Sequence, residues 1–249
     1  MIGAMAWILD LDGVVWRGDQ PIAGSAEAIA RLRASGEDVG FVTNFSYSPV
    51  ETVEAKLAGF GIEARGAVST SAQAAAGLLE PGERALLVAG PGVRQALEQR
   101  GVEVVADGDA DAVVVGWHPE FTYDRMAAAM RAVGHGARLV ATNDDATLPT
   151  PDGALPGGGA ILASIERATG VTAVVAGKPY PPSVEALWAR YGREGTMVGD
   201  RPDTDGRFAV ALGYRWALVL SGVATSAEVD PPPDVVAPTL ADLVAADGP

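Results

Sequence analysis

The sequence predicts an α/β protein built on a doubly wound, mostly parallel β-sheet. Short apolar runs alternate with helical patterns almost throughout the 249 residues. Several helical patterns begin at a capping residue and end at Gly, so that strand, capped helix and strand follow one another. The 31 Gly and 17 Pro imply many turns and therefore many short elements.

The N-terminal elements set the pattern. The apolar run Ala6–Leu9 is the first expected strand. Ser25 is expected to cap the helix that follows, and Gly36 to stop it. Val39–Val42 is the next strand, and Ser48-Pro49-Val50-Glu51 is typical of a capping box that opens the next helix.

The same alternation continues to the C-terminus. The further expected strands are 85–88, 102–105, 112–115, 139–142, 173–176, 196–198, 216–220 and 235–236. The further expected helices are 93–100, 122–133, 160–168, 183–191, 204–212 and a C-terminal helix capped by Thr239. Segment 144–159 is rich in Gly and Pro and is expected to be a loop. Two blocks rich in βα units fit two domains.

Composition excludes several classes of function. The 18 Lys and Arg against 32 Asp and Glu give a net charge of −14, which disfavours binding to nucleic acid or to anionic membranes. No apolar run approaches the roughly 20 residues of a membrane span. The absence of Cys excludes thiolate chemistry, and only two His are present. The start, Met1 to Trp7, lacks a basic segment and a long apolar stretch, so a cytoplasmic protein is expected.

Polar residues follow four of the expected strands. They are Asp10-Leu11-Asp12-Gly13, Thr43-Asn44, Gly177-Lys178-Pro179 and the segment Gly199 to Asp205. In α/β sheets, ligands bind outside the carboxyl ends of the strands, so these groups are expected at one rim. Clustered carboxylates need a cation among them, and Mg²⁺ prefers oxygen ligands. Carboxylates, Mg²⁺, an ammonium and a hydroxyl together suit a phosphoryl group.

These residues resemble, in order, the four motifs of the haloacid dehalogenase (HAD) superfamily. Asp10 to Gly18 resembles the first motif, in the form seen in the NagD-like, p-nitrophenylphosphatase branch. Thr43-Asn44 resembles the second motif, Lys178-Pro179 the third, and Gly199 to Asp205 the fourth. The resemblance covers nearly the whole chain and implies a Rossmann-like core and a phosphatase acting on small phosphorylated metabolites.

The resemblance also implies roles for the acids. Asp10 would be the nucleophile that forms an aspartyl-phosphate, and Asp12 the general acid and then the general base. Asp10, the main-chain carbonyl of Asp12, and Asp200 would hold Mg²⁺. Asp205 would act on the metal through water or would orient Lys178.

Further implied contacts serve the phosphoryl group. Thr43 and the main chain of Asn44 would hold phosphoryl oxygens, and Lys178 would neutralise charge on the nucleophile and the phosphoryl group. In the resembling branch the second motif often continues with Asn, whereas Phe45 stands here.

The resembling branch inserts an α/β cap domain between the second and third motifs. Here the cap would be residues 76–171, with the core formed by residues 1–75 and 172–249. Within the cap, the segment containing Asn143 and Asp144 resembles the part that lies near the substrate. Dimers through the cap are common in the branch, so a homodimer is an expectation that the resemblance allows.

Other functions stay open on the sequence alone. A dehalogenase also uses an Asp nucleophile but needs neither Asp12 nor Asp200. A phosphomutase or phosphotransferase of the same fold would keep the phosphoryl group on its substrates. A phospho-accepting signalling module combines clustered acids, Mg²⁺, Thr and Lys, but is much shorter than this chain.

Overall fold

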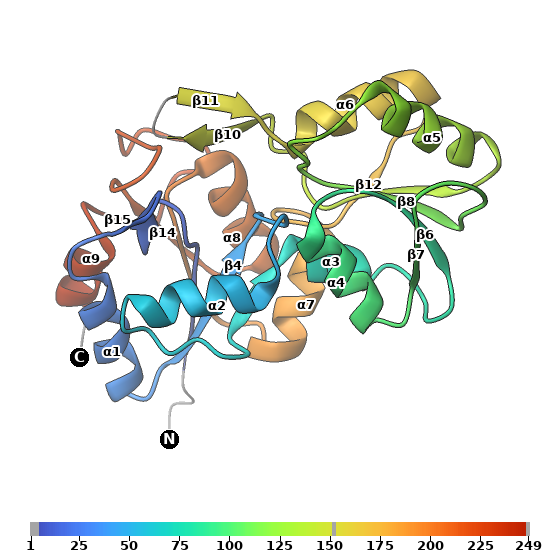
Figure 1. Cartoon of the computed structure of the whole chain (residues 1–249). Coiled ribbons are helices and arrows are strands. Elements are labelled where there is room, and N and C mark those ends of the chain that lie inside the picture. The colour runs from blue at the N-terminus through green and yellow to red at the C-terminus, as the bar shows by residue number, and fades with distance from the viewer. Residues whose placement is uncertain (1–4, 151–152, 248–249) are drawn as a thin grey trace. The chain divides into compact units, whose positions relative to one another are not determined.

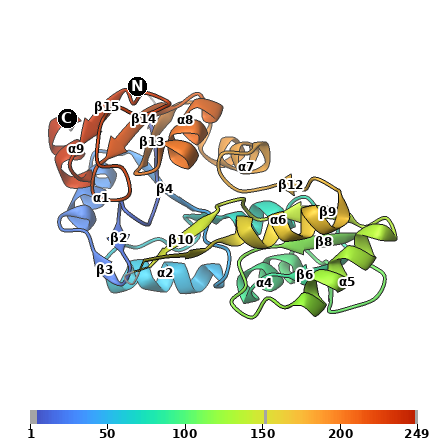
Figure 2. The same cartoon turned by 90° about the horizontal axis from the view of Figure 1, so that it is seen from above.

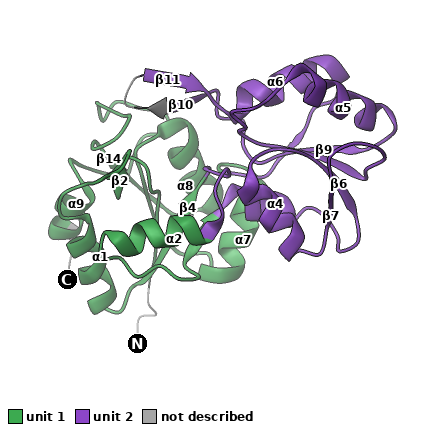
Figure 3. Cartoon of the chain, in the orientation of Figure 1, with its two compact units in different colours: residues 1–43, 51–69, 178–249 green, residues 44–50, 70–177 purple. Residues whose placement is uncertain are grey.

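The computed structural model describes residues 5–150 and 153–247 (Figure 1). The chain forms two compact units (Figure 3). The first unit holds the chain up to Thr43, then Glu51–Ser69, and the chain from Lys178 onward. The second unit holds Asn44–Val50 and Thr70–Gly177. The expectation of a cytoplasmic protein rests in part on Met1–Ala4, which lie outside the described residues.

The first unit is built on a six-stranded sheet in the order β15-β14-β13-β1-β4-β5. β1 is central and pairs in parallel with β13 on one side and with β4 on the other. The chain winds from β1 to one side first and returns to the other side later, which confirms the doubly wound, mostly parallel sheet. The strands are β1 (Ala6–Leu9), β4 (Asp38–Thr43), β5 (Val68–Thr70), β13 (Gly195–Gly199), β14 (Arg215–Val219) and β15 (Val235–Ala237).

Helices cover this sheet and build its core. Leu187 and Phe208, from two of these helices, pack with Ile8 and Met197 of the sheet. Full burial of a side chain of this size contributes about 1.5–3 kcal/mol, so these contacts fix the helices on the sheet. The helices are α1 (Ser25–Ala34), α2 (Val50–Gly59), α7 (Pro181–Tyr191), α8 (Arg207–Leu212) and α9 (Leu240–Asp247). A short hairpin of β2 (Trp16–Arg17) and β3 (Gln20–Pro21) follows β1.

The second unit has a sheet and core of its own. Alternate residues of its strands face opposite ways, so Leu87 packs with α3 and α4 on one face, and Leu86 packs with α5 and α6 on the other (Figure 1). The sheet order is β12-β9-β8-β6-β7. The strands are β6 (Arg84–Val88), β7 (Glu103–Val105), β8 (Ala112–Val115), β9 (Arg138–Ala141) and β12 (Val174–Val175). The helices are α3 (Ser71–Ala76), α4 (Pro91–Gln99), α5 (Tyr123–Gly134) and α6 (Gly158–Thr169).

Two local expectations are wrong. Ser25 does not cap α1: the cap residue is Gly24, whose φ of 80° suits glycine, and Ser25 Oγ donates to the Val14 carbonyl at 3.0 Å. The expected loop over 144–159 contains the hairpin of β10 (Thr147–Thr150) and β11 (Gly153–Pro156), seen beside α6 in Figure 2. The prolines of this segment hid the strand pattern, because Pro is confined to edge strands.

The units can be compared with the expected domain boundaries. The sequence places these boundaries after residues 75 and 171, whereas the second unit begins its main segment at Thr70 and ends at Gly177. The difference of several residues arises because α3 and β12 pack with the second unit's elements. Among the described residues, every helix is too short or too polar to cross a bilayer.

Candidate active site

The first acidic residue of the site stands where the central strand ends. The Asp10 main-chain N–H donates to the Val198 carbonyl at 2.9 Å, so β13 fixes the position of Asp10. The chain then turns sharply, because the N–H groups of Val14, Val15 and Trp16 all point to the Leu11 carbonyl. As a result, the buried Asp10 carboxylate lies at the carboxyl end of the sheet.

Two further acids follow the neighbouring strand β13. A π-helical turn, Pro202–Gly206, brings Asp205 back onto the end of the strand. Asp205 Oδ2 accepts hydrogen bonds from the N–H groups of Asp200 and Arg201, both at 3.1 Å. Gly199 makes this close return feasible, since a Cβ at that position would collide with the Asp205 carboxylate.

Lys178 joins the acids from the two strands. Its Nζ lies 2.6 Å from Asp10 Oδ1 and 2.7 Å from Asp205 Oδ1, and the lysine is 3% exposed. Desolvation lowers the pKa of Lys178, but the carboxylates of Asp10 and Asp205 outweigh it and raise the pKa above its usual range. Lys178 is therefore a permanently charged ammonium.

The cluster carries more negative charge than Lys178 can balance. Carboxylate oxygens of Asp10, Asp200 and Asp205 lie within 4.8 Å of one another. Three carboxylates beside one ammonium leave an excess of two negative charges. Desolvation, aided by the neighbouring acids, accordingly raises the pKa of Asp10 well above its usual value. Desolvation and then the charge of Asp205 raise the pKa of Asp200 to about 7.

A divalent cation fits this cluster. Among the described residues, Asp200 Oδ1 is buried and has no hydrogen-bond partner. An orphaned buried carboxylate oxygen costs free energy unless a cation meets it. Oxygen-only donors match the preference of Mg²⁺, whose two positive charges equal the excess.

The loop 221–223 positions Asp200. The N–H of Val223 donates to Asp200 Oδ2 at 2.6 Å. Two glycines lie close to the same carboxylate, since a Cβ at Gly13 or at Gly222 would collide with it. Ser221 Oγ donates to the Gly13 carbonyl at 2.6 Å and ties this loop to the first motif. Sequence reasoning missed the loop, and its only signal is a Ser-Gly pair directly after an expected strand.

Asp12 stands apart from the acidic cluster. Its residue is exposed, and its carboxylate is not among the clustered groups, so any contribution to a metal falls to its main-chain carbonyl. Trp16 Nε1 donates to Asp12 Oδ1 at 2.9 Å. Protein atoms around the carboxyl group desolvate it and raise the pKa of Asp12, although the residue as a whole is exposed. The Trp16 hydrogen bond and the charges of Lys56 and Lys178 oppose this rise.

The remaining expected site residues lie in or beside the link between the units. Thr43 is buried at the carboxyl end of β4. Asn44 follows it and is tied into the second unit, where its carbonyl accepts from Ser71 Oγ at 2.7 Å and from Asn143 Nδ2 at 2.8 Å. Asp144 is exposed in the same unit. Roles for Asn44, Asn143 and Asp144 at the substrate remain predictions.

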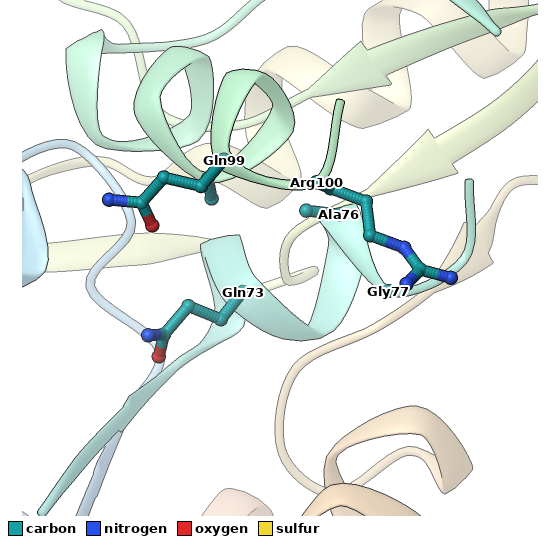
Figure 4. A pocket seen from close by; sticks show the side chains of 6 residues that line it. Gln73, Ala76, Gly77, Gln99 and Arg100 are labelled. Carbon is teal, nitrogen blue, oxygen red and sulfur yellow. The ribbon is translucent and has the colours of Figure 1, made fainter. Parts of the chain in front are cut away.

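The second unit has a surface hollow of a different kind. Figure 4 shows it between α3 and α4. Its one cation is engaged, since Arg100 Nε donates to the Leu79 carbonyl at 3.1 Å and the guanidinium lies 3.5 Å from Glu80. The lining offers amides and alanines and no nucleophile or acid, so this hollow is no candidate for catalysis. It is lined by Gln73, Ala76, Gly77, Ala96, Gln99 and Arg100.

Comparison with protein families gives a consistent result for both ends of the chain. The family of haloacid dehalogenase-like hydrolases matches residues 7–103. A second, HAD-hydrolase-like family matches residues 175–243. The two matched segments contain Asp10, Asp12, Lys178, Asp200 and Asp205.

Individual relatives extend the likeness over the whole chain. An acid sugar phosphatase of Staphylococcus saprophyticus is 34% identical over 233 residues, which is 90% of each chain. The structure of a glycerol phosphate phosphatase from Mycobacterium tuberculosis in complex with magnesium has a TM-score of 0.89 at 35% identity, covering 96% of this chain and 76% of that one. A p-nitrophenyl phosphatase from Archaeoglobus fulgidus has a TM-score of 0.90 at 29% identity, covering 98% and 99%.

Proposed function

The chain belongs to the haloacid dehalogenase-like hydrolases, as a phosphatase of the NagD-like kind, and from this premise we propose that it hydrolyses small phosphate monoesters with Mg²⁺ through an aspartyl-phosphate. The observation that carries the proposal is the buried cluster of Asp10, Asp200 and Asp205 around Lys178. This cluster joins a nucleophile, a cation site and a fixed positive charge at the end of one sheet.

The first step is transfer of the phosphoryl group to Asp10. A carboxylate oxygen of Asp10 attacks phosphorus while the bond from phosphorus to the ester oxygen breaks. Asp12 gives its proton to the departing oxygen, and its raised pKa suits a group that must carry a proton. Lys178 holds Asp10 in place and offers positive charge to the phosphoryl oxygens.

The second step is hydrolysis of the aspartyl-phosphate. Asp12, now a carboxylate, takes a proton from water, and that water oxygen bonds to phosphorus as the acyl-phosphate bond breaks. Phosphate and the free Asp10 carboxylate result. Thr43 at the end of β4 and the main-chain N–H of Asn44 are proposed to hold phosphoryl oxygens during both steps.

The acids of the cluster would hold the metal. Asp10, Asp200 and the Asp12 carbonyl are the proposed ligands, with Asp205 acting through water or through its contact with Lys178. When bound, Mg²⁺ supplies positive charge that stabilises the phosphoryl group in the transition state. The unpartnered Asp200 Oδ1 is the feature of this chain that fits this role.

The second unit is proposed to be the cap that selects the leaving group. Its continuous segment Thr70–Gly177 lies between Thr43 and Lys178 in the sequence. This is the position at which the family inserts its cap. Asn143 and Asp144 are the proposed contacts to the substrate. The relatives that act on sugar phosphate, glycerol phosphate and p-nitrophenyl phosphate suggest substrates of this size. A homodimer through this unit and a cytoplasmic location also remain proposals.

A phosphate-release screen tests the function. The purified chain is incubated with sugar phosphates, glycerol phosphate and p-nitrophenyl phosphate, with Mg²⁺ or with EDTA, beside the variant Asp12→Ala. We expect Mg²⁺-dependent release that the variant loses. A protein that moves the phosphoryl group between positions of its substrate without releasing phosphate would instead be a phosphomutase. A protein that keeps the aspartyl-phosphate for minutes would be a signalling module.

A further inference from the structure

The indole of Trp16 makes a directed contact with Asp12. Trp16 Nε1 donates to Asp12 Oδ1 at 2.9 Å, and the tryptophan is 4% exposed. The two residues are also joined by a main-chain bridge, so the hydrogen bond closes a small loop around Gly13. The single N–H of a buried indole therefore holds the carboxyl group of Asp12, a residue that is otherwise exposed.

The Trp16 ring is itself held in place. The Phe60 ring lies against it in a tilted arrangement with the centroids 6.0 Å apart. Lys56 Nζ sits 4.4 Å from the centroid of the Trp16 ring and donates to the Gly18 carbonyl at 2.7 Å. A cation over an indole face contributes about 0.5–1 kcal/mol at exposed sites. The ring, carried by β2, is thus held by Lys56 of α2 and by Phe60 just after it, and the direction of its N–H is fixed with it.

The chemistry of the indole gives this contact a consequence. An indole N–H is a donor only, so the oxygen that it meets must act as an acceptor whether or not Asp12 carries a proton. The carbonyl oxygen of a carboxylic acid is a stronger acceptor than its hydroxyl oxygen, so the contact at Oδ1 favours the proton on Oδ2. The contact selects which oxygen exchanges the proton and limits rotation of the carboxyl group.

We propose that Trp16 is a positioning residue that presents Asp12 Oδ2 for proton exchange with the leaving group and with water. This inference rests on the proposed function and deepens it. In the first step the proton on Oδ2 passes to the ester oxygen as the bond to phosphorus breaks; in the second, Oδ2 takes a proton from the attacking water. The indole keeps its own proton throughout.

The substitution Trp16→Phe tests the inference, since it keeps an aromatic ring and removes the N–H. Two substrates separate proton transfer from binding. An alkoxide, as in glycerol phosphate, needs a proton to leave, whereas p-nitrophenolate leaves without one. General acid catalysis contributes about 10²–10⁴-fold. We expect kcat/KM to fall about 10–100-fold for glycerol phosphate and less than about threefold for p-nitrophenyl phosphate, most of it in kcat.

Two control variants distinguish positioning from packing. Phe60→Leu loosens the ring that Phe60 helps to hold but keeps the N–H, so its selective loss for glycerol phosphate should be smaller than that of Trp16→Phe. In an Asp12→Ala background, Trp16→Phe should add no further selective loss for glycerol phosphate. An equal loss on both substrates in Trp16→Phe, or a selective loss in Phe60→Leu as large as that in Trp16→Phe, would overturn the inference.

An activity-independent measurement covers the case in which the proposed function fails. The chain has five Trp, and the indole N–H signal of Trp16 in a ¹H–¹⁵N spectrum is the one missing in Trp16→Phe. That signal should shift in Asp12→Asn, because an amide oxygen is a weaker acceptor than a carboxylate. It should stay in place in Glu51→Gln, on the exposed start of α2. A wild type inactive on both substrates contradicts the proposed function, whereas an unmoved signal in Asp12→Asn contradicts the positioning contact.

Discussion

Replacing Lys178 by Met should destabilise the protein strongly, and in a way that depends on metal and pH. Lys178 is the only cation within hydrogen-bonding distance of the clustered acids among the residues that the structure describes. Met has nearly the same length and removes only the charge and the hydrogen bonds. The variant would leave three buried carboxylates without an ammonium among them.

The size of this destabilisation follows from the contacts of Lys178 Nζ with Asp10 at 2.6 Å and with Asp205 at 2.7 Å. At an effective dielectric constant of about 20, each contact of that length is worth roughly 6 kcal/mol of gross attraction. Desolvation of the charges cancels most of it, and removing one partner of a buried pair costs about 3–5 kcal/mol net. In a chain of this size, 1 kcal/mol shifts Tm by about 2–4 °C, so we expect a fall of roughly 6–20 °C.

Thermal unfolding in EDTA, repeated with Mg²⁺ and at pH 5 and pH 8, measures the effect. The raised pKa of Asp200, about 7, means that this group takes up a proton in the folded state below that pH. Its contribution to stability is present at low pH and is lost as pH rises through 7. The loss in Lys178→Met should therefore be larger at pH 8 than at pH 5, and Mg²⁺ should recover part of it.

The other lysine of the chain supplies the matched control. Lys56 is partly exposed and binds the Gly18 carbonyl and the Trp16 ring, so Lys56→Met should cost no more than about 1 kcal/mol, independent of Mg²⁺. A Lys178→Met protein as stable as Lys56→Met in EDTA at pH 8 would refute the charge-balance argument.

Three further outcomes are expected. In calorimetric titrations, Mg²⁺ affinity should rise between pH 5 and 7, because the metal must displace the proton of Asp200, whose pKa is about 7; a flat profile would contradict this. Gly222→Ala should weaken Mg²⁺ binding at least tenfold in the same titration, since the added Cβ collides with the Asp200 carboxylate; unchanged binding would exclude loop 221–223 from the site. Asp10→Asn should lower phosphate release at least about 10³-fold while the melting curve shows a folded protein, because an amide cannot serve as the nucleophile; substantial residual turnover would point to another nucleophile.

Much of the fold was predictable from sequence because apolar runs and capped helices alternate so regularly. The run at Ala6–Leu9 is β1 to the residue, and the strand ends carry the polar groups that the structure gathers at one edge. Asp10 and Asp205 are 195 positions apart, yet a parallel sheet brings the ends of β1 and β13 together whatever their separation. Lys178 follows β12, a strand of the second unit's sheet, and joins the two acids from outside the six-stranded sheet.

What the sequence could not predict depends on contacts between distant segments. Trp16 meets Asp12 because Phe60 and Lys56 hold its ring, and no periodicity encodes that contact. Loop 221–223 binds Asp200 through the main-chain N–H of Val223, which leaves no trace in residue type apart from the preceding Ser221-Gly222 pair. The β10–β11 hairpin was hidden by its prolines, and Ser25, which resembles a cap, bonds instead to a carbonyl eleven residues earlier.

Trapping the covalent intermediate tests the central claim most directly. In Asp12→Asn the water that hydrolyses the aspartyl-phosphate loses its base, so incubation with p-nitrophenyl phosphate and Mg²⁺ should leave one phosphoryl group on the chain. Intact-mass measurement and peptide mapping at low pH should place it on Asp10, with none on Asp10→Asn/Asp12→Asn. A wild type that releases phosphate while the trapped group lies on another residue, or on none, would contradict the mechanism.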